Sequence, residues 1–323
     1  MSNQVERCEA TVCGHRMSYL RAGPLGGSAV VLLHGLASDS GTWTPAIPLL
    51  AGHGLRVFAL DLLGHGDSDK PAISYELDEL ARQVEQFLTA VDVPRATVCG
   101  HSLGGAVAMQ VAFRYPERVE RMVLVAAGGL GRQVHVALRA AAVPGAQYLL
   151  GAALRPSLIR VYRRPGFHRA LRLRPDAVVN LRRAGRALGS VEGRSAFFAS
   201  LNGVISPSGQ RGSFIEMRNL ATHVPVLLVW SERDGDPAVA RARRSGAPAG
   251  ERAGGVPRRR ARTAPAQRGR VRSGSRGLRR IHAVRSGPRQ PRRKIKVAPR
   301  STGDHGATLI TAACGFVQMI RRS

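Results

Sequence analysis

Cysteine and long apolar runs are scarce in this chain of 323 residues. The four cysteines, Cys8, Cys13, Cys99 and Cys314, are scattered and match no metal-ligand spacing. We therefore expect free thiols in a reducing, cytoplasmic compartment and no bound metal. No uncharged apolar run reaches the roughly 18 residues that a membrane-spanning helix requires. The first residues also lack the basic-then-apolar layout of a secretory signal.

Acidic residues are scarce as well, and the imbalance is concentrated in one part of the chain. The whole sequence has 49 basic and 21 acidic residues, a net charge of +28. Residues 1–237 contain 26 basic and 19 acidic residues, whereas residues 238–300 contain 21 basic residues and one acid, Glu251. The sequence therefore consists of two different kinds of chain that meet near Asp236.

The best-defined motif is Gly100-His101-Ser102-Leu103-Gly104. The apolar run 96–99 precedes it and a run with helical spacing, 106–113, follows it. A strand, a G-x-S-x-G turn and a helix together form the context in which a serine is presented as a nucleophile. The alternative interpretation is a glycine turn that happens to contain a serine.

The surrounding pattern predicts an α/β protein. Alternating residues at 8–20 indicate a hairpin, and the apolar runs 29–33, 56–60 and 121–126 indicate buried parallel strands. Helices are expected at 43–50, at 75–91 and after the serine. Asp61, His65 and Asp67 lie in a glycine-rich segment, where we expect them to hold a loop in place rather than to act as acids or bases.

These motifs resemble the α/β-hydrolase superfamily. The segments that carry the resemblance are HGLASDSGTW (34–43), DLLGHGDSDKP (61–71) and GHSLGGAVAMQVAFRYPERV (100–119). The similarity extends over about residues 8–235 and is greatest to bacterial esterases, C–C bond hydrolases and proteins like epoxide hydrolases. Epoxide hydrolases and haloalkane dehalogenases have aspartate at the nucleophile position, so Ser102 argues against those two activities.

The resemblance implies a division of the chain and a set of site residues. Residues 1–129 would form the first part of the hydrolase core, 130–212 a helical cap, and 213–237 a core strand with the acid loop. Ser102 would be the nucleophile, and the backbone amides of Leu36 and Leu103 would form the oxyanion hole. Asp234, just after the apolar run 223–230, would be the acid of the triad, with Asp236 as the alternative. No cofactor is implied.

The expected cap is cationic. Residues 128–218 contain 15 basic residues and three acids. Such a surface could attract an anionic substrate or lipid headgroups. A solvated basic helical surface is the simpler interpretation, and we favour it.

The histidine of the triad is missing from its expected place. The family would place it about 25–35 residues after the acid, in a Gly-His loop that precedes a closing helix. No histidine lies between His223 and His282. Residues 238–300 have too few apolar residues to fold, so we expect disorder there. His305 is a weak candidate, because it precedes an expected helix within 301–323 but lies about 70 residues beyond Asp234.

A change of reading frame near codons 234–236 would explain these features together. Reading codons 259–279 one base later, with synonymous codons chosen freely, permits AGHAPHPRNAAEFAAAVEDFV. This sequence contains a Gly-His loop and an amphipathic helix. The same slip converts Asp236-Pro237 into Ile-Pro, which usually follows the acid in this family.

The sequence therefore predicts a serine hydrolase that acts on a small ester, thioester or activated C–C bond, with activity in doubt because the base is missing. One alternative is a hydrolase-like binding protein without activity. A less favoured alternative is a binder of nucleic acid or another anionic polymer through residues 238–300, since arginine runs without aromatic residues are a weak signal.

The frame hypothesis makes a prediction about the coding DNA. The nucleotide sequence that encodes residues 234–279, read one base later, should encode a Gly-His loop followed by an amphipathic helix. A shifted frame without that loop would contradict the hypothesis. Sequencing of the locus is the measurement.

Overall fold

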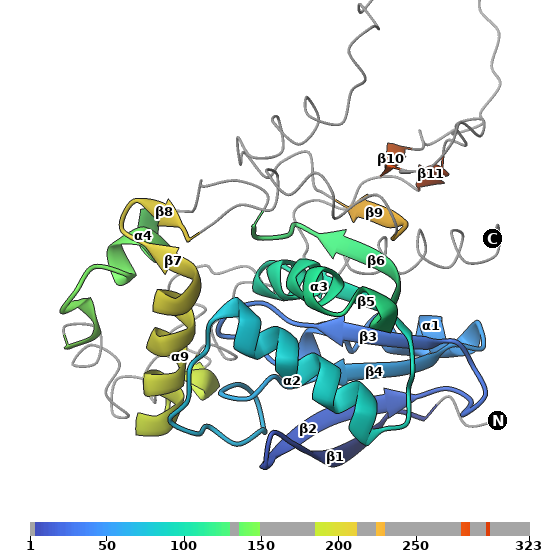
Figure 1. Ribbon diagram of the computed structural model, residues 1–323, viewed down its shortest axis with the longest axis horizontal. Helices are drawn as coiled ribbons and strands as arrows, with labels where there is room; N and C mark the ends of the chain where they lie inside the picture. The colour runs from blue at the N-terminus through green and yellow to red at the C-terminus, as the bar shows by residue number, and fades with distance from the viewer. Residues whose placement is uncertain are drawn as a thin grey trace, which may run out of the picture.

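The computed structural model describes residues 4–129, 136–148, 185–211 and 224–229, and the backbone of two further strands at 279–284 and 295–297. Its nine-stranded sheet has the order β1-β2-β4-β3-β5-β6-β9-β10-β11 (Figure 1). The strands are β1 (Glu6–Val12), β2 (His15–Ala22), β3 (Ala29–Leu33), β4 (Arg56–Leu60), β5 (Ala96–His101), β6 (Val119–Val125), β9 (Val226–Val229), β10 (Arg279–Val284) and β11 (Ile295–Val297).

The centre of the sheet is parallel, and antiparallel strands lie on both sides of it. Strands β4, β3, β5, β6 and β9 pair in parallel. The β1–β2 hairpin adds to β4 in antiparallel fashion, and β10 does the same at β9. The predicted α/β class and the N-terminal hairpin are therefore confirmed. Strands β10 and β11 fall within 238–300, and the remaining residues of that segment lie outside the described residues.

Helices and short 3-10 turns connect the strands. They are η1 (Ser40–Trp43), α1 (Ile47–Gly52), α2 (Leu77–Ala90), α3 (Leu103–Arg114) and η2 (Pro116–Arg118). The described parts of the expected cap are α4 (Val136–Ala141), α9 (Val191–Val204) and a small hairpin of β7 (Ile205–Ser206) and β8 (Gly209–Gln210). Residues 149–184 of the expected cap lie outside the described residues.

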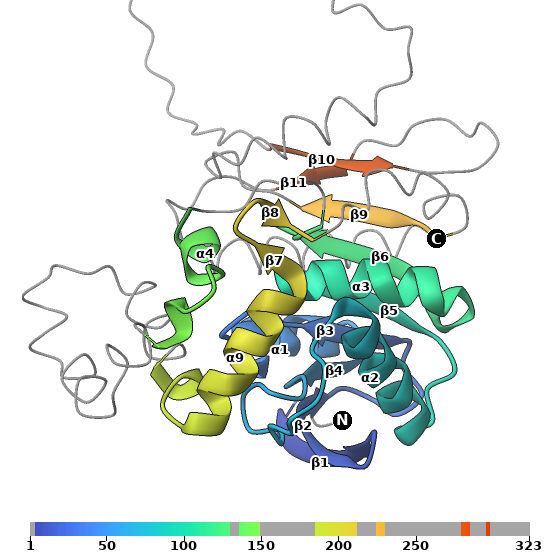
Figure 2. The ribbon, with the colours of Figure 1, turned by 60° about the vertical axis from the view of Figure 1, so that its left-hand side comes forward.

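Helices cover both faces of the sheet, which explains why the central strands are apolar throughout. All five residues of β3 are buried. Val31 and Leu33 belong to the core cluster that includes residues of α2 and α3, whereas Val30 and Leu32 belong to the cluster that includes Trp43 and α1. Successive side chains of a strand point to opposite faces, so each face needs its own apolar set. Figure 2 shows α2 and α3 side by side over one face.

One predicted helix is placed differently. The segment 43–50 was expected to be a single helix, but η1 ends at Trp43 and α1 begins only at Ile47. Asp39 accepts a hydrogen bond from the backbone N–H of Gly41 at 3.0 Å and so begins the first turn. Pro48 lies in the first turn of α1, where its missing N–H costs nothing. The local capping groups therefore divide the segment into two elements.

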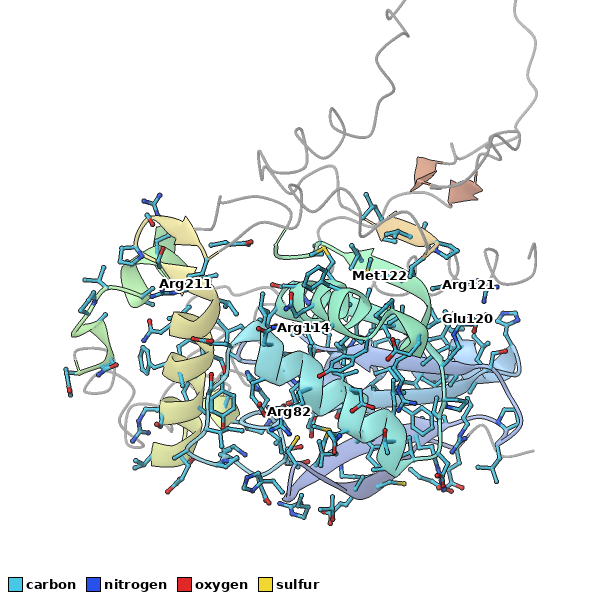
Figure 3. The ribbon with its side chains drawn as sticks, viewed as in Figure 1. Arg82, Arg114, Glu120, Arg121, Met122 and Arg211 are labelled. Atoms are coloured by element: carbon cyan, nitrogen blue, oxygen red, sulfur yellow. The ribbon has the colours of Figure 1, made fainter. Side chains whose placement is uncertain are left out.

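An ion pair joins the N-terminal turn of α2 to the C-terminal turn of α3. Arg114, which is labelled in Figure 3, lies in the last turn of α3. Its Nε donates at 2.9 Å to Asp78 in the first turn of α2. The Arg114 guanidinium lowers the pKa of the Asp78 carboxyl. A carboxylate at a helix N-terminus and a cation at a C-terminus also complement the two helix dipoles.

Within the described residues, no helix is both long and apolar enough to cross a membrane.

The aromatic packing under α2 gives a stability prediction. Phe87 is fully buried and packs edge-on against Tyr19 at 4.9 Å and Phe58 at 5.7 Å between ring centroids. Phe87→Ala should lower the free energy of unfolding by about 3–5 kcal/mol, because it removes a buried ring and leaves a cavity. Urea denaturation followed by circular dichroism measures the change.

The matched control is Phe113→Ala on α3, where the side chain is 47% exposed. Its cost should be less than about 1 kcal/mol. Equal losses in the two variants would contradict the assignment of Phe87 to the core.

Candidate active site

Ser102 occupies the sharp turn between β5 and α3. Its φ of 52° and ψ of −114° lie in a region that residues other than glycine rarely adopt. Strain of this kind persists only where the surrounding structure holds the residue in place, and it is concentrated at functional sites. The predicted elbow at 100–104 is therefore present in the backbone geometry itself.

The glycines of the motif are required by close approach of backbone. A Cβ atom at Gly100 would overlap the carbonyl of Gly104, and one at Gly104 would overlap the carbonyl of Leu33. A Cβ at Gly105 would collide with Ala127. Glycine at these positions lets α3 start directly against β3 and β5, so the turn can be as tight as it is.

Hydrogen bonds fix the orientation of the strained residue. The N–H of Ser102 donates to the carbonyl of Val125 at 3.1 Å. The Ser102 carbonyl accepts from the N–H of Gly128 at 2.8 Å and of Gly105 at 3.0 Å. Because a trans peptide is planar, the C=O of Ser102 and the N–H of Leu103 point in opposite directions. The Leu103 N–H, the first of α3, therefore points away from Gly128 and has no acceptor within its own helix.

The predicted oxyanion loop lies directly against the serine. An ideal Cβ on Gly35 would be 3.3 Å from Cβ of Ser102 and 3.2 Å from Nδ1 of His101. The loop turns back at once, with Ala37 at a φ of 54° and the N–H of Ser38 donating to the Gly35 carbonyl at 3.2 Å. Leu36 lies within this turn. The structure thus brings Ser102, Leu103 and Leu36 together.

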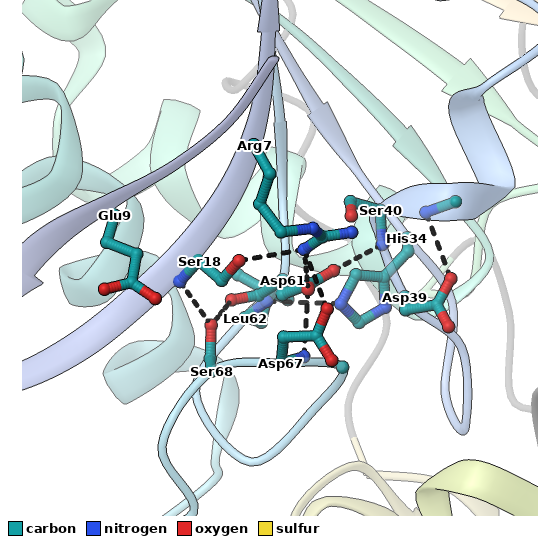
Figure 4. A network of polar contacts seen from close by, with 12 residues as sticks. Arg7, Glu9, Ser18, His34, Asp39, Ser40, Asp61, Leu62, Asp67 and Ser68 are labelled. Carbon is teal, nitrogen blue, oxygen red and sulfur yellow. Dashed lines mark hydrogen bonds and ion pairs between the residues drawn. The ribbon is translucent and has the colours of Figure 1, made fainter. Parts of the chain in front are cut away.

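Asp61 holds one end of this loop from beneath (Figure 4). Its fully buried carboxylate accepts from the N–H of Ser40 at 2.5 Å, from the N–H of Asp67 at 3.0 Å and from Arg7 at 3.1 Å. Burial acts to raise the pKa of Asp61, but the hydrogen bonds that its carboxylate accepts from the N–H groups of Asp67 and Ser40 act in the opposite direction, and the pKa is lowered. Asp61 is therefore an ionised structural anchor.

His34 holds the other end. The N–H of Leu62 donates to Nε2 of His34 at 3.2 Å, so Nδ1 carries the proton and donates to the carbonyl of Gly35 at 2.8 Å. The loop between His34 and Ser40 is therefore held at its two ends by consecutive residues, Asp61 and Leu62. With both ring nitrogens bound to backbone, His34 is not available as a base.

His65 lies behind the loop. Its ring centroid is 5.0 Å from that of His34, and its Nδ1 lies 3.2 Å from the Leu63 carbonyl. Burial lowers the pKa of His65 to about 3, so the ring is neutral and out of reach of a substrate. The expected structural role is confirmed for Asp61 and is consistent with the buried position of His65. Asp67 contributes its backbone N–H, while its exposed side chain pairs with Arg7.

The other predicted triad residues, Asp234, Asp236 and His305, lie outside the described residues. The strand that precedes Asp234 and Asp236, β9, ends at the same end of the sheet as the elbow. The carbonyl of Val229, the last residue of β9, accepts from the N–H of Ala126 at 2.9 Å, directly beside the elbow. The chain therefore leaves β9 at the same end of the sheet as Ser102, with β6 between the two strands, five residues before Asp234.

The described residues of the expected cap contact the 34–40 loop and the loop after β6 at two points that the sequence analysis missed. The N–H of Gly129 donates to Oε1 of Gln210 at 2.5 Å, and Arg186 pairs with Asp39 at 3.2 Å. Leu36 also packs against an apolar cluster of the cap, formed by Ala142, Phe198, Leu201 and Ile205. Neither polar contact has a local sequence signal, because the paired residues lie 81 and 147 positions apart.

A sequence profile described as the alpha/beta hydrolase fold matches residues 28–240, about two thirds of the chain. The chain belongs to the α/β-hydrolase family. This α/β-hydrolase is 34% identical over 233 residues to an uncharacterized protein of Mycobacterium tuberculosis, a match that covers 69% of the chain and 66% of the relative. It is also 37% identical over 130 residues to a 2-hydroxy-6-oxo-6-(2'-aminophenyl)hexa-2,4-dienoic acid hydrolase of Metapseudomonas resinovorans, covering 39% and 44% of the two chains.

Solved structures show the same fold. A serine hydrolase involved in carbazole degradation superposes with a TM-score of 0.56 at 24% identity and covers 75% of this α/β-hydrolase and 85% of that chain. The chain spans slightly less than two thirds of the length of the mycobacterial relative.

Asp61 gives the testable prediction for this site. Asp61→Asn should lower the free energy of unfolding by roughly 1–3 kcal/mol at neutral pH. The neutral amide would accept weaker hydrogen bonds from the N–H groups of Ser40 and Asp67 and would lose the charge that attracts Arg7. The folded pKa lies below the ordinary 3.8, so this stabilisation is present above that value and is lost as the pH falls through the folded pKa. The difference between wild type and variant in urea melts should therefore shrink below about pH 4.

The control is Asp67→Asn, which changes a second carboxylate paired with Arg7, at 3.0 Å, but 67% exposed. It should change the stability by less than about 1 kcal/mol. A loss as large as that of Asp61→Asn would refute the anchoring role of Asp61.

Proposed function

We propose that this α/β-hydrolase is a serine hydrolase acting on a small ester, thioester or activated C–C bond. The observation that carries the proposal is the strained backbone of Ser102, with Gly35 so near that a Cβ added to it would lie 3.3 Å from the Ser102 Cβ. The Ser102 oxygen would attack the carbonyl carbon and give its proton to a base. The amides of Leu36 and Leu103 would stabilise the negative oxygen that forms. The leaving group would depart, and water would release the acyl group.

The proposed substrate class has two supports. The named relative from Metapseudomonas resinovorans is a hydrolase of a dienoic acid. The apolar cluster of the expected cap extends to Leu36, so an acyl group bound beside the oxyanion loop would meet apolar side chains. The free thiols of Cys8, Cys13 and Cys99 agree with the proposed cytoplasmic location.

We propose Asp234, with Asp236 as the alternative, as the acid that orients the base. His34 and His65 are unsuited as bases because backbone contacts and burial hold them, and we keep His305 as a weak candidate for the base. The family profile stops matching at residue 240, close to codons 234–236. This supports the proposal that a change of frame removed the original histidine, in which case this chain would hydrolyse its substrate slowly.

An esterase assay tests the nucleophile. The full chain should hydrolyse p-nitrophenyl acetate at least about 10-fold faster than Ser102→Ala, because residual catalysis without the nucleophile comes only from binding and the oxyanion hole. Ser74→Ala, which changes an exposed serine on the surface, should match wild type. Equal rates for wild type and Ser102→Ala would favour a hydrolase-like binding protein instead.

A second assay separates the frame proposal from the nucleophile proposal. A chain whose frame is shifted by one base at codons 234–236 should gain at least about 10³-fold in kcat/KM, because a triad works as a unit. The gain should vanish when Ser102→Ala is added. A frame-shifted chain that folds but shows no gain in kcat/KM would contradict the frame proposal. The proposal that Ser102 is the nucleophile would still be judged by the first assay.

A further inference from the structure

Gln210 joins the cap to the loop that follows β6. It is the last residue of β8, and its Oε1 accepts from the N–H of Gly129 at 2.5 Å. The β7–β8 hairpin, next to the Arg211 that Figure 3 labels, lies near the carboxyl end of β6. A further contact supports the hairpin itself, since Arg139 donates to the carbonyl of Pro207 at 2.8 Å.

The loop that Gln210 holds is the one that orients the nucleophile. Gly128 precedes the bound residue, and its N–H donates to the Ser102 carbonyl at 2.8 Å. A Cβ added to Gly128 would lie 3.3 Å from the carbonyl oxygen of Ser102 and 3.5 Å from Nε2 of Gln210. Gly128 therefore lies between Gln210 and the elbow.

The Ser102 carbonyl in turn sets the direction of an oxyanion donor. The peptide between Ser102 and Leu103 is planar, so holding its C=O toward Gly128 aims its N–H the opposite way. The same carbonyl also accepts from the N–H of Gly105 at 3.0 Å and of Ala106 at 3.4 Å, both in the first turn of α3. The Gly128 bond, at 2.8 Å, is the shortest of the three, so its loss would loosen the peptide without freeing it. The strained φ of Ser102 favours a shift of the peptide once that bond is lost.

We propose that Gln210 is a positioning residue, which holds Gly128 against the Ser102 carbonyl and so aims the Leu103 N–H into the oxyanion hole. This inference rests on the proposed function. The cap would then orient the nucleophile turn in addition to covering the proposed site. The same α9–β8 unit also packs against Leu36, the other proposed donor. The same part of the cap therefore contacts Leu36 directly and acts on Leu103 through Gly129, Gly128 and Ser102.

Two substitutions separate the hydrogen bond from the bulk of the side chain. Gln210→Leu removes the acceptor at nearly constant volume, whereas Gln210→Glu keeps an acceptor oxygen. The matched control is Gln86→Leu, because Gln86 is exposed on α2 and its amide donates only to Glu85 among the described hydrogen bonds. Thermal unfolding of each full-length variant verifies that it folds.

The first readout is reactivity of Ser102. A fluorophosphonate forms a bond from the serine oxygen to phosphorus, with loss of fluoride to solvent and of the hydroxyl proton to the base or buffer. The oxyanion hole accelerates this step. Gln210→Leu should react about 10-fold more slowly, while Gln210→Glu and Gln86→Leu should stay within about 3-fold of wild type. For p-nitrophenyl acetate, kcat should fall with little change in KM.

The second readout is amide hydrogen exchange at Gly128 and Gly129, which does not require activity. Exchange should rise at least about 10-fold in Gln210→Leu and stay near the wild-type rate in Gln210→Glu. Unchanged labelling and kcat in a folded Gln210→Leu would overturn the positioning role. A wild-type chain that neither reacts with the probe nor turns over the ester would instead show that the proposed function has failed, and the positioning role would fall with it.

Discussion

The structure depends on the left-handed conformation of a single residue, Ser102. Its unfavourable φ costs of order 1–3 kcal/mol in isolation and persists because neighbouring backbone leaves no alternative. Gly100, Gly104 and Gly105 let α3 begin against the sheet, and the carbonyl of Val125 fixes the serine amide. The parallel sheet is thus the frame that places one hydroxyl at the carboxyl ends of its strands.

Two loops from other parts of the chain are positioned against this residue. The 34–40 loop, the proposed oxyanion loop, is anchored at both ends, through Asp61 and through the bond from Leu62 to His34. The loop after β6 is held by Gln210 from the cap. Each anchor acts on backbone N–H or C=O groups, so the site is shaped by peptide orientation and by few side chains.

The features that could be predicted from sequence are those with a local physical cause. Buried strands such as 29–33 were recognisable because both faces of a covered sheet must be apolar, and the elbow was recognisable from its glycine spacing. The helix expected at 43–50 was misplaced because capping by Asp39 and the position of Pro48 divide it. The contacts of Arg7 and Gln210 could not be predicted, since their partners lie 54 and 81 residues away and are brought near only by folding.

The central claim is that Ser102 is a nucleophile, and trapping its acyl adduct tests this most directly. The full-length protein is mixed with p-nitrophenyl acetate, quenched with acid and mapped by mass spectrometry. Slow deacylation in a chain without its proper base should let the adduct accumulate. The account predicts an acetyl group on Ser102 that is absent from Ser102→Ala. Acetylation confined to lysine side chains, with Ser102 unmodified, would contradict it.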